Sequence, residues 1–291
     1  PTGDDLSLLA RAGDIHKHAR GRLVVLAGGA GSTGAARIAA AAGLCGGAGL
    51  ATLLCPGSSL QEVATSVRSE LTVKRDETLS MREQLEALRA KAAVLGPAGG
   101  IGERLAGQVL SAAAGSCPLV IDADALTSFE ADPARLFNAL EAPAILTPHE
   151  GEFARLFPDL AEAGRDGRMN KIERTRAAAE RAGCVVLLKG RDTVIAEPGR
   201  TPAVNLHADP ALATAGSGDA LAGLIGAALA QGMAPFEAAC LMSWVHGEAG
   251  RLMGPGATAE TLLSRLPEAL HALALRRRRR AALTRVQRSS P

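Results

Sequence analysis

Aromatic residues are scarce in this chain. Its 291 residues include no tyrosine, one tryptophan and five phenylalanines, although 47% of the residues are hydrophobic. The core must therefore be filled mainly by alanine, valine, leucine and isoleucine, and the 33 glycines allow helices to pack closely on strands. The length is compatible with one large α/β domain, and we expect a single domain.

Strong charge of one sign and long apolar runs are lacking as well. The 32 basic and 30 acidic residues leave a net charge of +2, without the basic excess of a dedicated nucleic-acid binder, so we expect no nucleic-acid partner. No apolar run approaches the roughly 20 residues of a membrane helix, and the first residues lack a signal pattern. The five cysteines are scattered without CxxC spacing, which predicts neither a zinc site nor a disulfide framework. We therefore expect a cytoplasmic protein with no membrane partner.

Short apolar runs alternate with helical segments along the chain. Strands are predicted at residues 23–27, 49–55, 92–95, 119–121, 144–146 and 185–188, and helices at 35–43, 80–91, 170–182, 219–230 and 235–252. This alternation predicts an α/β fold with a mostly parallel central sheet flanked by helices on both faces. Residues 193–196 and 201–204 flank the turn EPGR and predict an antiparallel hairpin at a sheet edge.

The two ends of the chain carry little pattern. We assign residues 1–20 to a linker, 21–275 to the domain, and 276–291, which begin with five arginines, to a basic disordered tail. The arginine run could instead bind nucleic acid or anionic lipid.

The most informative loop is ALATAGSGDALAG at residues 211–223, where a small-residue turn runs into a helix. Backbone amides of Gly216, Ser217 and Gly218 would form an anion site at the helix N-terminus. Asp219, in the first turn, could accept a proton from a hydroxyl that attacks a phosphoryl group. Alternatively, Asp219 merely caps the helix.

The segment LLKGRDT places a lysine directly after a buried strand. Lys189 could meet nucleotide phosphates there, and Thr193 could hydrogen-bond to them. A surface lysine at a strand end is an equally common arrangement, so this motif is weak evidence alone.

The segment TPHEGE follows another strand and clusters polar side chains beyond its end. His149 could bind a substrate amide or phosphate, and Glu150 or Glu152 could hold magnesium through water. The alternative is a helix that starts at Pro148 and has acidic residues in its first turn.

Three further turns follow strands. In VIDADA, Asp122 and Asp124 are expected on one face of the strand, where such a pair binds a divalent ion or a ribose, unless one caps the next helix. Glycine-rich turns occupy residues 28–34 and 96–102. The first is only a loose match to a dinucleotide fingerprint, because it lacks the acidic residue about 20 positions further on.

Taken in order, these loops resemble those of the ADP- or ATP-dependent NAD(P)H-hydrate dehydratases of the ribokinase-like superfamily. The similarity extends from His16 to about Gly250. Its segments are HKHARGRLVVLAGG, STGAARIAAAAGLCGGAGLATLLCP, AAVLGP, LVIDADAL, ILTPHEGEFARLF, VVLLKGRDTVIA, LATAGSGDALAGLIGAALAQGM and WVHGEAG.

The resemblance implies a ribokinase-like fold and the dehydration of (6S)-NAD(P)H hydrate to NAD(P)H, with ADP or ATP as co-substrate and Mg²⁺. The ring hydroxyl would be phosphorylated, and phosphate would then be eliminated. Asp219 would be the catalytic base, beside the anion hole of Gly216, Ser217 and Gly218. The nucleotide would be bound by Gly218 together with Lys189, Gly190, Arg191, Asp192 and Thr193. The hydrated dinucleotide would be bound by Asp219 together with Ala35, Gly96, Gly100 and His149.

The resemblance also bears on metal and partners. Glu152 and Asp122 are the candidate metal ligands, a homo-oligomer is expected, and the opening residues are similar to the junction that follows an epimerase domain in two-domain members of the family.

Two departures from the family pattern concern the site. Ala98 stands where a glycine is common, and Ala208 and Asp209 replace a Gly-Asn pair, although Asn205 remains nearby. The sequence does not decide between ADP and ATP.

Two other functions fit part of the pattern. A superfamily kinase of a small vitamin-precursor alcohol would use the same anion hole and aspartate, but TPHEGE and KGRDT favour the dehydratase. A non-catalytic nucleotide-binding regulator would not require Asp219.

Overall fold

A nine-stranded sheet organises the chain in its computed structural model, which describes residues 20–67, 69, 71–254 and 256–289. From edge to edge the strands are β3 (Leu71–Lys74), β2 (Leu50–Cys55), β1 (Arg22–Leu26), β4 (Ala92–Leu95), β5 (Leu119–Ile121), β6 (Ala144–Leu146), β7 (Val185–Leu188), β8 (Thr193–Ala196) and β9 (Ala203–Asn205). Pairing is parallel from β3 to β7 and antiparallel from β7 to β9.

The sheet confirms the sequence prediction with two differences. All six predicted parallel strands are present, and the predicted edge hairpin is β8 and β9, paired through Val194 and Val204. Strand β3 was not predicted, because its sequence LTVK is a short edge segment without an apolar run. Strand β9 begins two residues later than expected.

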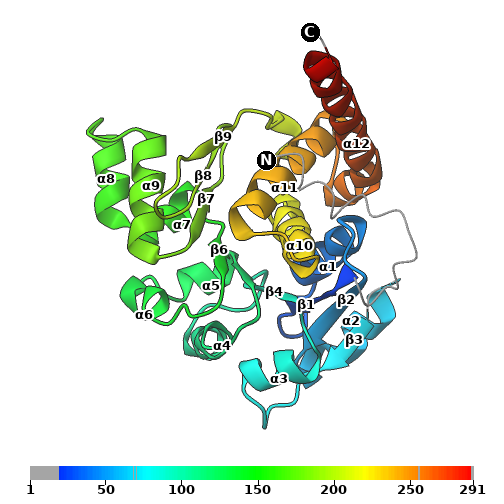
Figure 1. The fold of residues 1–291 in the computed structure, drawn as a ribbon. Coiled ribbons are helices and arrows are strands. Elements are labelled where there is room, and N and C mark those ends of the chain that lie inside the picture. Colours follow the sequence, from blue (N-terminus) through cyan, green and yellow to red (C-terminus); the bar gives the residue numbers. More distant parts are fainter. Residues whose placement is uncertain (1–19, 68, 70, 255, 290–291) are drawn as a thin grey trace.

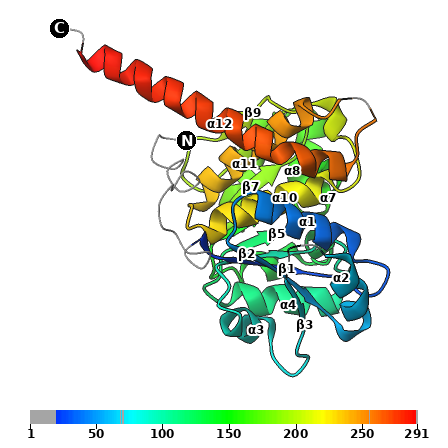
Figure 2. The same ribbon diagram turned by 90° about the vertical axis from the view of Figure 1, so that its right-hand side faces the viewer.

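Helices cover both faces of the sheet, as Figure 2 shows. Five contribute to the core of the first face: α1 (Gly34–Cys45), α2 (Leu60–Ser66), α10 (Ser217–Ala230), α11 (Pro235–Arg251) and α12 (Ala259–Ser289). The second face is covered by α3 (Met81–Ala87), α4 (Glu103–Ala113), α5 (Ala123–Thr127), α6 (Pro133–Phe137), α7 (Glu150–Leu156), α8 (Pro158–Arg165) and α9 (Lys171–Ala182). Two 3₁₀ turns, η3 (Gly57–Ser59) and η4 (Pro210–Leu212), complete the elements.

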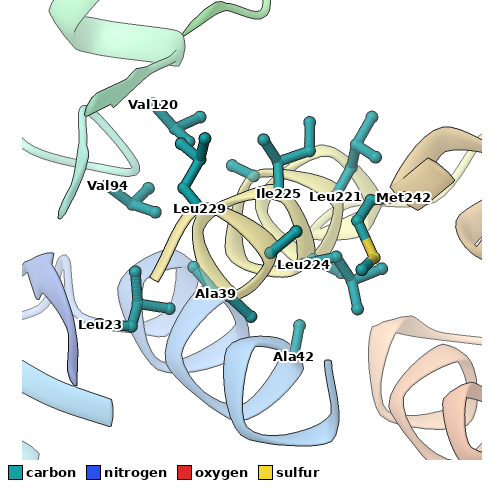
Figure 3. Packing of buried hydrophobic residues seen from close by; sticks show 14 of the residues in the cluster. Leu23, Ala39, Ala42, Val94, Val120, Leu221, Leu224, Ile225, Leu229 and Met242 are labelled. Atoms are coloured by element: carbon teal, nitrogen blue, oxygen red, sulfur yellow. The ribbon is translucent and has the colours of Figure 1, made fainter. Parts of the chain in front are cut away.

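Alternation along the strands divides the core between the two faces. In β1, Leu23 and Val25 face the first core, and Val24 and Leu26 face the second. In the first core, side chains of α10 such as Leu229 meet those of the strands (Figure 3).

Small residues bring α1 and α10 into close contact on this face (Figure 1). A Cβ on Gly223 would collide with the carbonyl oxygen of Ala39, so only glycine permits this approach of the two backbones. The first core is therefore aliphatic and small-residue rich, as the composition predicts, whereas Phe153 and Phe157 are fully buried in the second.

Helix α12 differs from the sequence prediction. It runs through the expected boundary at residue 275 and continues to Ser289, where a disordered tail was expected (Figures 1 and 2). Leu262 and Leu266 anchor its first half in the core, and the alanine, leucine and arginine residues that follow are good helix formers, so the helix propagates. The predicted linker, apart from Arg20, lies outside the described residues.

No helix among the residues with a described structure is long and apolar enough to cross a bilayer.

Candidate functional site

The loops singled out from the sequence lie at the carboxyl ends of strands, along one edge of the sheet. Strand β1 pairs with β2 on one side and β4 on the other, so the strand order reverses between β1 and β4. Ligands of open α/β sheets bind at such a reversal. The glycine-rich turns 28–34 and 96–102 follow these two strands.

A cleft of about 600 Å³ opens next to the N-terminus of α10. Its walls are the N-terminus of α10, the turn after β7, the segment 205–214 and α11. Its lining residues are His149, Lys189, Gly190, Arg191, Thr193, Asn205, Ala208, Asp209, Pro210, Leu212, Ala213, Thr214, Ser217, Gly218, Leu221, Ser243, His246 and Gly247.

The predicted anion site is the first turn of α10. Gly216 is the N-cap, with a φ of 87° that favours glycine, and the helix begins at Ser217. The Ser217 amide donates to Thr214 O at 3.3 Å, so it is already engaged. The amides of Gly218 and Asp219, in the first turn, have no acceptor one turn earlier in the helix. They are the best placed to bind an anion.

His246 holds this turn, a contact that the sequence did not reveal. Its Nε2 lies 2.9 Å from the carbonyl oxygen and 3.1 Å from the Oγ of Ser217. Burial lowers the pKa of His246 to about 4, against the opposing effect of the hydrogen bond to Ser217. A neutral imidazole therefore donates its Nε2–H to the Ser217 carbonyl and fixes the turn.

Lys189 lies between carboxylates and the helix N-terminus. Its Nζ is 2.8 Å from Asp122 Oδ1 and 3.8 Å from Glu152 Oε2, and it lies 3.5 Å from where a Cβ on Gly218 would be. Burial alone would lower the pKa of Lys189, but attraction to Asp122 and Glu152 outweighs burial and raises it. The ammonium therefore keeps its charge at neutral pH.

Asp219 lies in the first turn of α10, close to this charge cluster. Burial and repulsion from Asp122 raise the pKa of Asp219 to about 6, although Lys189 opposes the change. A carboxyl that titrates near neutral pH can both accept and return a proton.

The pair Asp122 and Asp124 does not share a face of the strand. Ala123 between them has a φ of 48°, and Asp124 already belongs to α5. Asp122 turns to Lys189, whereas Asp124 Oδ2 accepts from the Gly100 amide at 2.9 Å. Asp124 thus holds the glycine turn, which corrects the expectation of a paired ion or ribose ligand.

The segment TPHEGE forms a capped helix start. His149 is the N-cap of α7: its Nδ1 accepts from the Gly151 and Glu152 amides, and its own amide donates to Glu152 Oε2. This is the alternative interpretation of the segment, with the helix beginning at Glu150. The His149 side chain is 55% exposed and still lines the cleft.

The turn after β7 is stabilised from beneath. The Thr193 hydroxyl donates to Gly190 O, and Lys171 Nζ contacts Asp192 Oδ1 at 3.1 Å and Lys189 O at 3.3 Å. Thr193 and Asp192 therefore shape the turn, whereas Arg191 is exposed at the cleft.

Apart from His149, the predicted contacts of the dinucleotide are not among the residues that line the cleft. Ala35 is in the first turn of α1, and Gly96 and Gly100 are in the turn after β4, both at the strand-order reversal. Ala98, the departure from the family glycine, has a φ of 50°. All the nucleotide candidates but Asp192 thus line the cleft, whereas Ala35, Gly96 and Gly100 lie at the strand-order reversal.

Candidate metal ligands are few. The residues described include no group of three or more His, Cys, Asp or Glu side chains arranged to hold a metal ion. Asp122 and Glu152 share Lys189 instead, so their assignment to a metal stays a prediction.

The chain is similar to proteins of one family. Residues 23–271 match the model of the NAD(P)H-hydrate dehydratase family. The chain is 35% identical over 244 residues to the ADP-dependent (S)-NAD(P)H-hydrate dehydratase of Neisseria meningitidis serogroup B, covering 82% of this chain and 79% of that protein.

A longer relative and a solved structure agree. The bifunctional NAD(P)H-hydrate repair enzyme Nnr of Gloeobacter violaceus is 37% identical over 264 residues, which are 87% of this chain and 50% of that protein. The chain thus spans about half the length of the bifunctional relatives. The structure of an ADP/ATP-dependent NAD(P)H-hydrate dehydratase from Bacillus subtilis, co-crystallised with ATP/Mg²⁺, superposes with a TM-score of 0.75 at 25% identity, covering 95% of this chain and 98% of that one.

The fold is ribokinase-like. With the family match extending over the whole sheet and its carboxyl edge, this chain belongs to the NAD(P)H-hydrate dehydratase family.

Proposed function

We propose that this chain uses ADP or ATP to dehydrate (6S)-NAD(P)H hydrate to NAD(P)H. The observation that carries the proposal is the position of Asp219 in the first turn of α10, next to Gly218 of the cleft wall and within electrostatic reach of Asp124, which holds the Gly100 amide. The nucleotide would occupy the cleft, with its phosphates at the amides of Gly218 and Asp219. The hydrated ring would lie at the strand-order reversal, within reach of Asp219.

The first step is transfer of a phosphoryl group to the ring hydroxyl. Asp219 accepts the hydroxyl proton while the oxygen forms a bond to the terminal phosphorus, and the bond from that phosphorus to the rest of the nucleotide breaks. The raised pKa of Asp219, about 6, suits a base that works near neutral pH.

The second step removes the phosphate. The bond between the ring carbon and its phosphorylated oxygen breaks with assistance from the ring nitrogen. The neighbouring ring carbon gives up a proton to solvent as the double bond forms. Phosphate is a far better leaving group than hydroxide, so the nucleotide supplies the driving force for the dehydration.

Charge balance bears on the magnesium requirement. Lys189 is one ammonium beside three carboxylates, Asp122, Glu152 and Asp219. Such a donor set would repel nucleotide phosphates unless a cation came with them, and Mg²⁺ needs only one or two carboxylates besides the phosphates. The residues therefore fit the ion, and Asp122 and Glu152 would hold it. Bound there, Mg²⁺ would neutralise charge that develops on the phosphates.

The test is recovery of NADH from its hydrate. Purified protein is incubated with hydrated NADH, magnesium and either ADP or ATP, and the absorbance of the reduced nicotinamide is followed. We expect recovery with nucleotide and none without it. A stable phosphorylated alcohol would instead indicate a kinase, and nucleotide binding without any turnover would indicate a regulator.

A further inference from the structure

The segment 205–214 is a wall of the cleft that has little regular structure of its own. Seven of its residues line the cleft: Asn205, Ala208, Asp209, Pro210, Leu212, Ala213 and Thr214. It contains only the last residue of β9 and the 3₁₀ turn η4. Both of these elements pack against α11.

Contacts with α11 begin at Asn205. Its Nδ2 donates to Ser243 O at 2.9 Å, and its Oδ1 accepts from the His207 amide at 3.1 Å. The asparagine side chain thus connects the helix to the backbone of the segment.

His207 makes the main side-chain contacts. Its ring stacks on Trp244, with centroids 5.2 Å apart and an interplanar angle of 3°. Its Nε2–H donates to Glu248 Oε2 at 2.5 Å, and Arg251 holds Glu248 through two further contacts at 2.7 and 3.1 Å. The His207 side chain is not part of the cleft lining, so it acts on a ligand only through the segment.

Glycines of α11 leave room for the segment. A Cβ on Gly247 would collide with the carbonyl oxygen of His207, and a Cβ on Gly250 would lie 2.6 Å from Leu212 Cγ. The two glycines therefore form a bare strip on the helix, against which the backbone of the segment lies.

We propose that His207 is a positioning residue for the nucleotide, because it fixes the segment 205–214 on the strip of α11 formed by Trp244, Gly247, Glu248 and Gly250. This inference rests on the proposed function of the cleft. It also explains the sequence WVHGEAG at residues 244–250. His246 of this sequence contacts the anion-site turn, and all its other residues except Val245 and Ala249 lie against the segment 205–214.

The test compares ADP affinity and steady-state kinetics among variants. His207→Ala removes the ring and the hydrogen bond, and His207→Gln keeps a planar donor. Gly247 itself lines the cleft, but a Cβ there would point at the carbonyl oxygen of His207, so Gly247→Ala displaces the segment through its backbone without changing its sequence. Gly107→Ala is the matched control, because Gly107 is also inside a helix and has open space where a Cβ would stand.

We expect H207A and G247A to raise the Kd for ADP about tenfold and the KM for nucleotide in proportion, with H207Q between them and wild type. The kcat at saturating nucleotide and the KM for the hydrate should stay within about twofold, which a general loss of structure would not allow. G107A should behave as wild type. If H207A does not fold, G247A gives the same comparison.

Equal ADP affinity in wild type, H207A and G247A would overturn the inference and leave the proposed function standing. A fall of kcat together with weaker binding of both nucleotide and hydrate would also overturn the inference. A wild-type protein that bound no nucleotide would overturn the proposed function and this inference with it.

Discussion

The ammonium of Lys189 lies among carboxylates at the carboxyl edge of the sheet. Asp122 is almost fully buried against it, and Glu152 and Asp219 act on it electrostatically. Attraction to this cation offsets part of the free-energy cost of burying the carboxylates. The pKa of Asp219 is raised to about 6, so this carboxyl carries a proton at mildly acidic pH.

This balance predicts how activity and stability depend on pH. The pKa of Asp219 is raised from 3.8 to about 6, so the base form, and with it kcat, should increase as pH rises through about 6.

The stability of the fold should change over the same range. Because the folded chain holds this proton more tightly than the unfolded chain, ionisation of Asp219 destabilises the folded state. The free energy of unfolding should therefore decrease as pH rises from 3.8 to above about 6. Asp219→Asn should therefore raise the Tm relative to wild type at pH 8 and much less near pH 4. Thermal melts across this range check it, and an equal difference at both ends would show that Asp219 does not titrate in this window.

Removal of the ammonium should have two separable effects. Lys189→Met leaves the buried Asp122 without its ion-pair partner, which should destabilise the fold by about 3 to 5 kcal/mol. It should also weaken nucleotide binding by one to two orders of magnitude, corresponding to about 1.5 to 3 kcal/mol. Binding of the hydrated dinucleotide should change less. Calorimetric titration with each ligand measures this. Should dinucleotide binding collapse while nucleotide binding is unaffected, the two halves of the site are assigned in the wrong order.

At the scale of elements, the glycine turn after β4 contains a strained residue. Ala98 has a φ of 50°, a conformation that L-residues other than glycine rarely adopt. Ala98→Gly should therefore raise the free energy of unfolding by about 0.5 to 1 kcal/mol, because relief of strain exceeds the added entropy of the unfolded chain. Ala134→Gly, at an exposed position of α6, is the control and should lower it by about 0.5 to 1 kcal/mol. Urea denaturation distinguishes the two, and destabilisation by A98G would show that the turn bears no strain.

How far the sequence predicted these elements depended on the kind of signal. Strands such as β5 and β7 and the helix after GSGD were predicted because an apolar run or a glycine turn marks them locally. The capping role of His149 was foreseen only as an alternative. The partners of Lys189 and His207 were not foreseen, because Asp122 is 67 residues away from the first and Glu248 is 41 residues away from the second. Such contacts depend on strand order and helix packing, which spacing in one sequence does not specify.

At the scale of the whole molecule, the two ends of the described chain contribute unequally. The body from β1 to the first half of α12 contains both cores and the whole candidate site. The second half of α12 extends away from this body (Figure 2). Arg276 is the last residue whose side chain has a described contact, with its guanidinium 4.7 Å from the Trp244 ring centroid.

A chain that ends after Arg276 should therefore retain the Tm, nucleotide affinity and activity of the full chain, because residues 277–291 have no apolar periodicity to bury. An exposed cation–π contact contributes about 0.5 to 1 kcal/mol, so removal of Arg276 as well should lower the Tm only slightly. Differential scanning calorimetry of both truncations checks this. A fall of several degrees in the Tm of the chain that ends after Arg276 would show that the end of α12 packs on the domain.

The central claim is that Asp219 is the base of a phosphoryl transfer that drives dehydration. It is tested most directly by the rate of NADH recovery from hydrated NADH, with saturating nucleotide and magnesium, in wild type and in Asp219→Asn. The account predicts that the variant folds, binds nucleotide with nearly unchanged affinity and turns over at least about 100-fold more slowly. Turnover of the variant close to that of wild type would contradict it, and would leave Asp219 as no more than a residue of the first turn of α10.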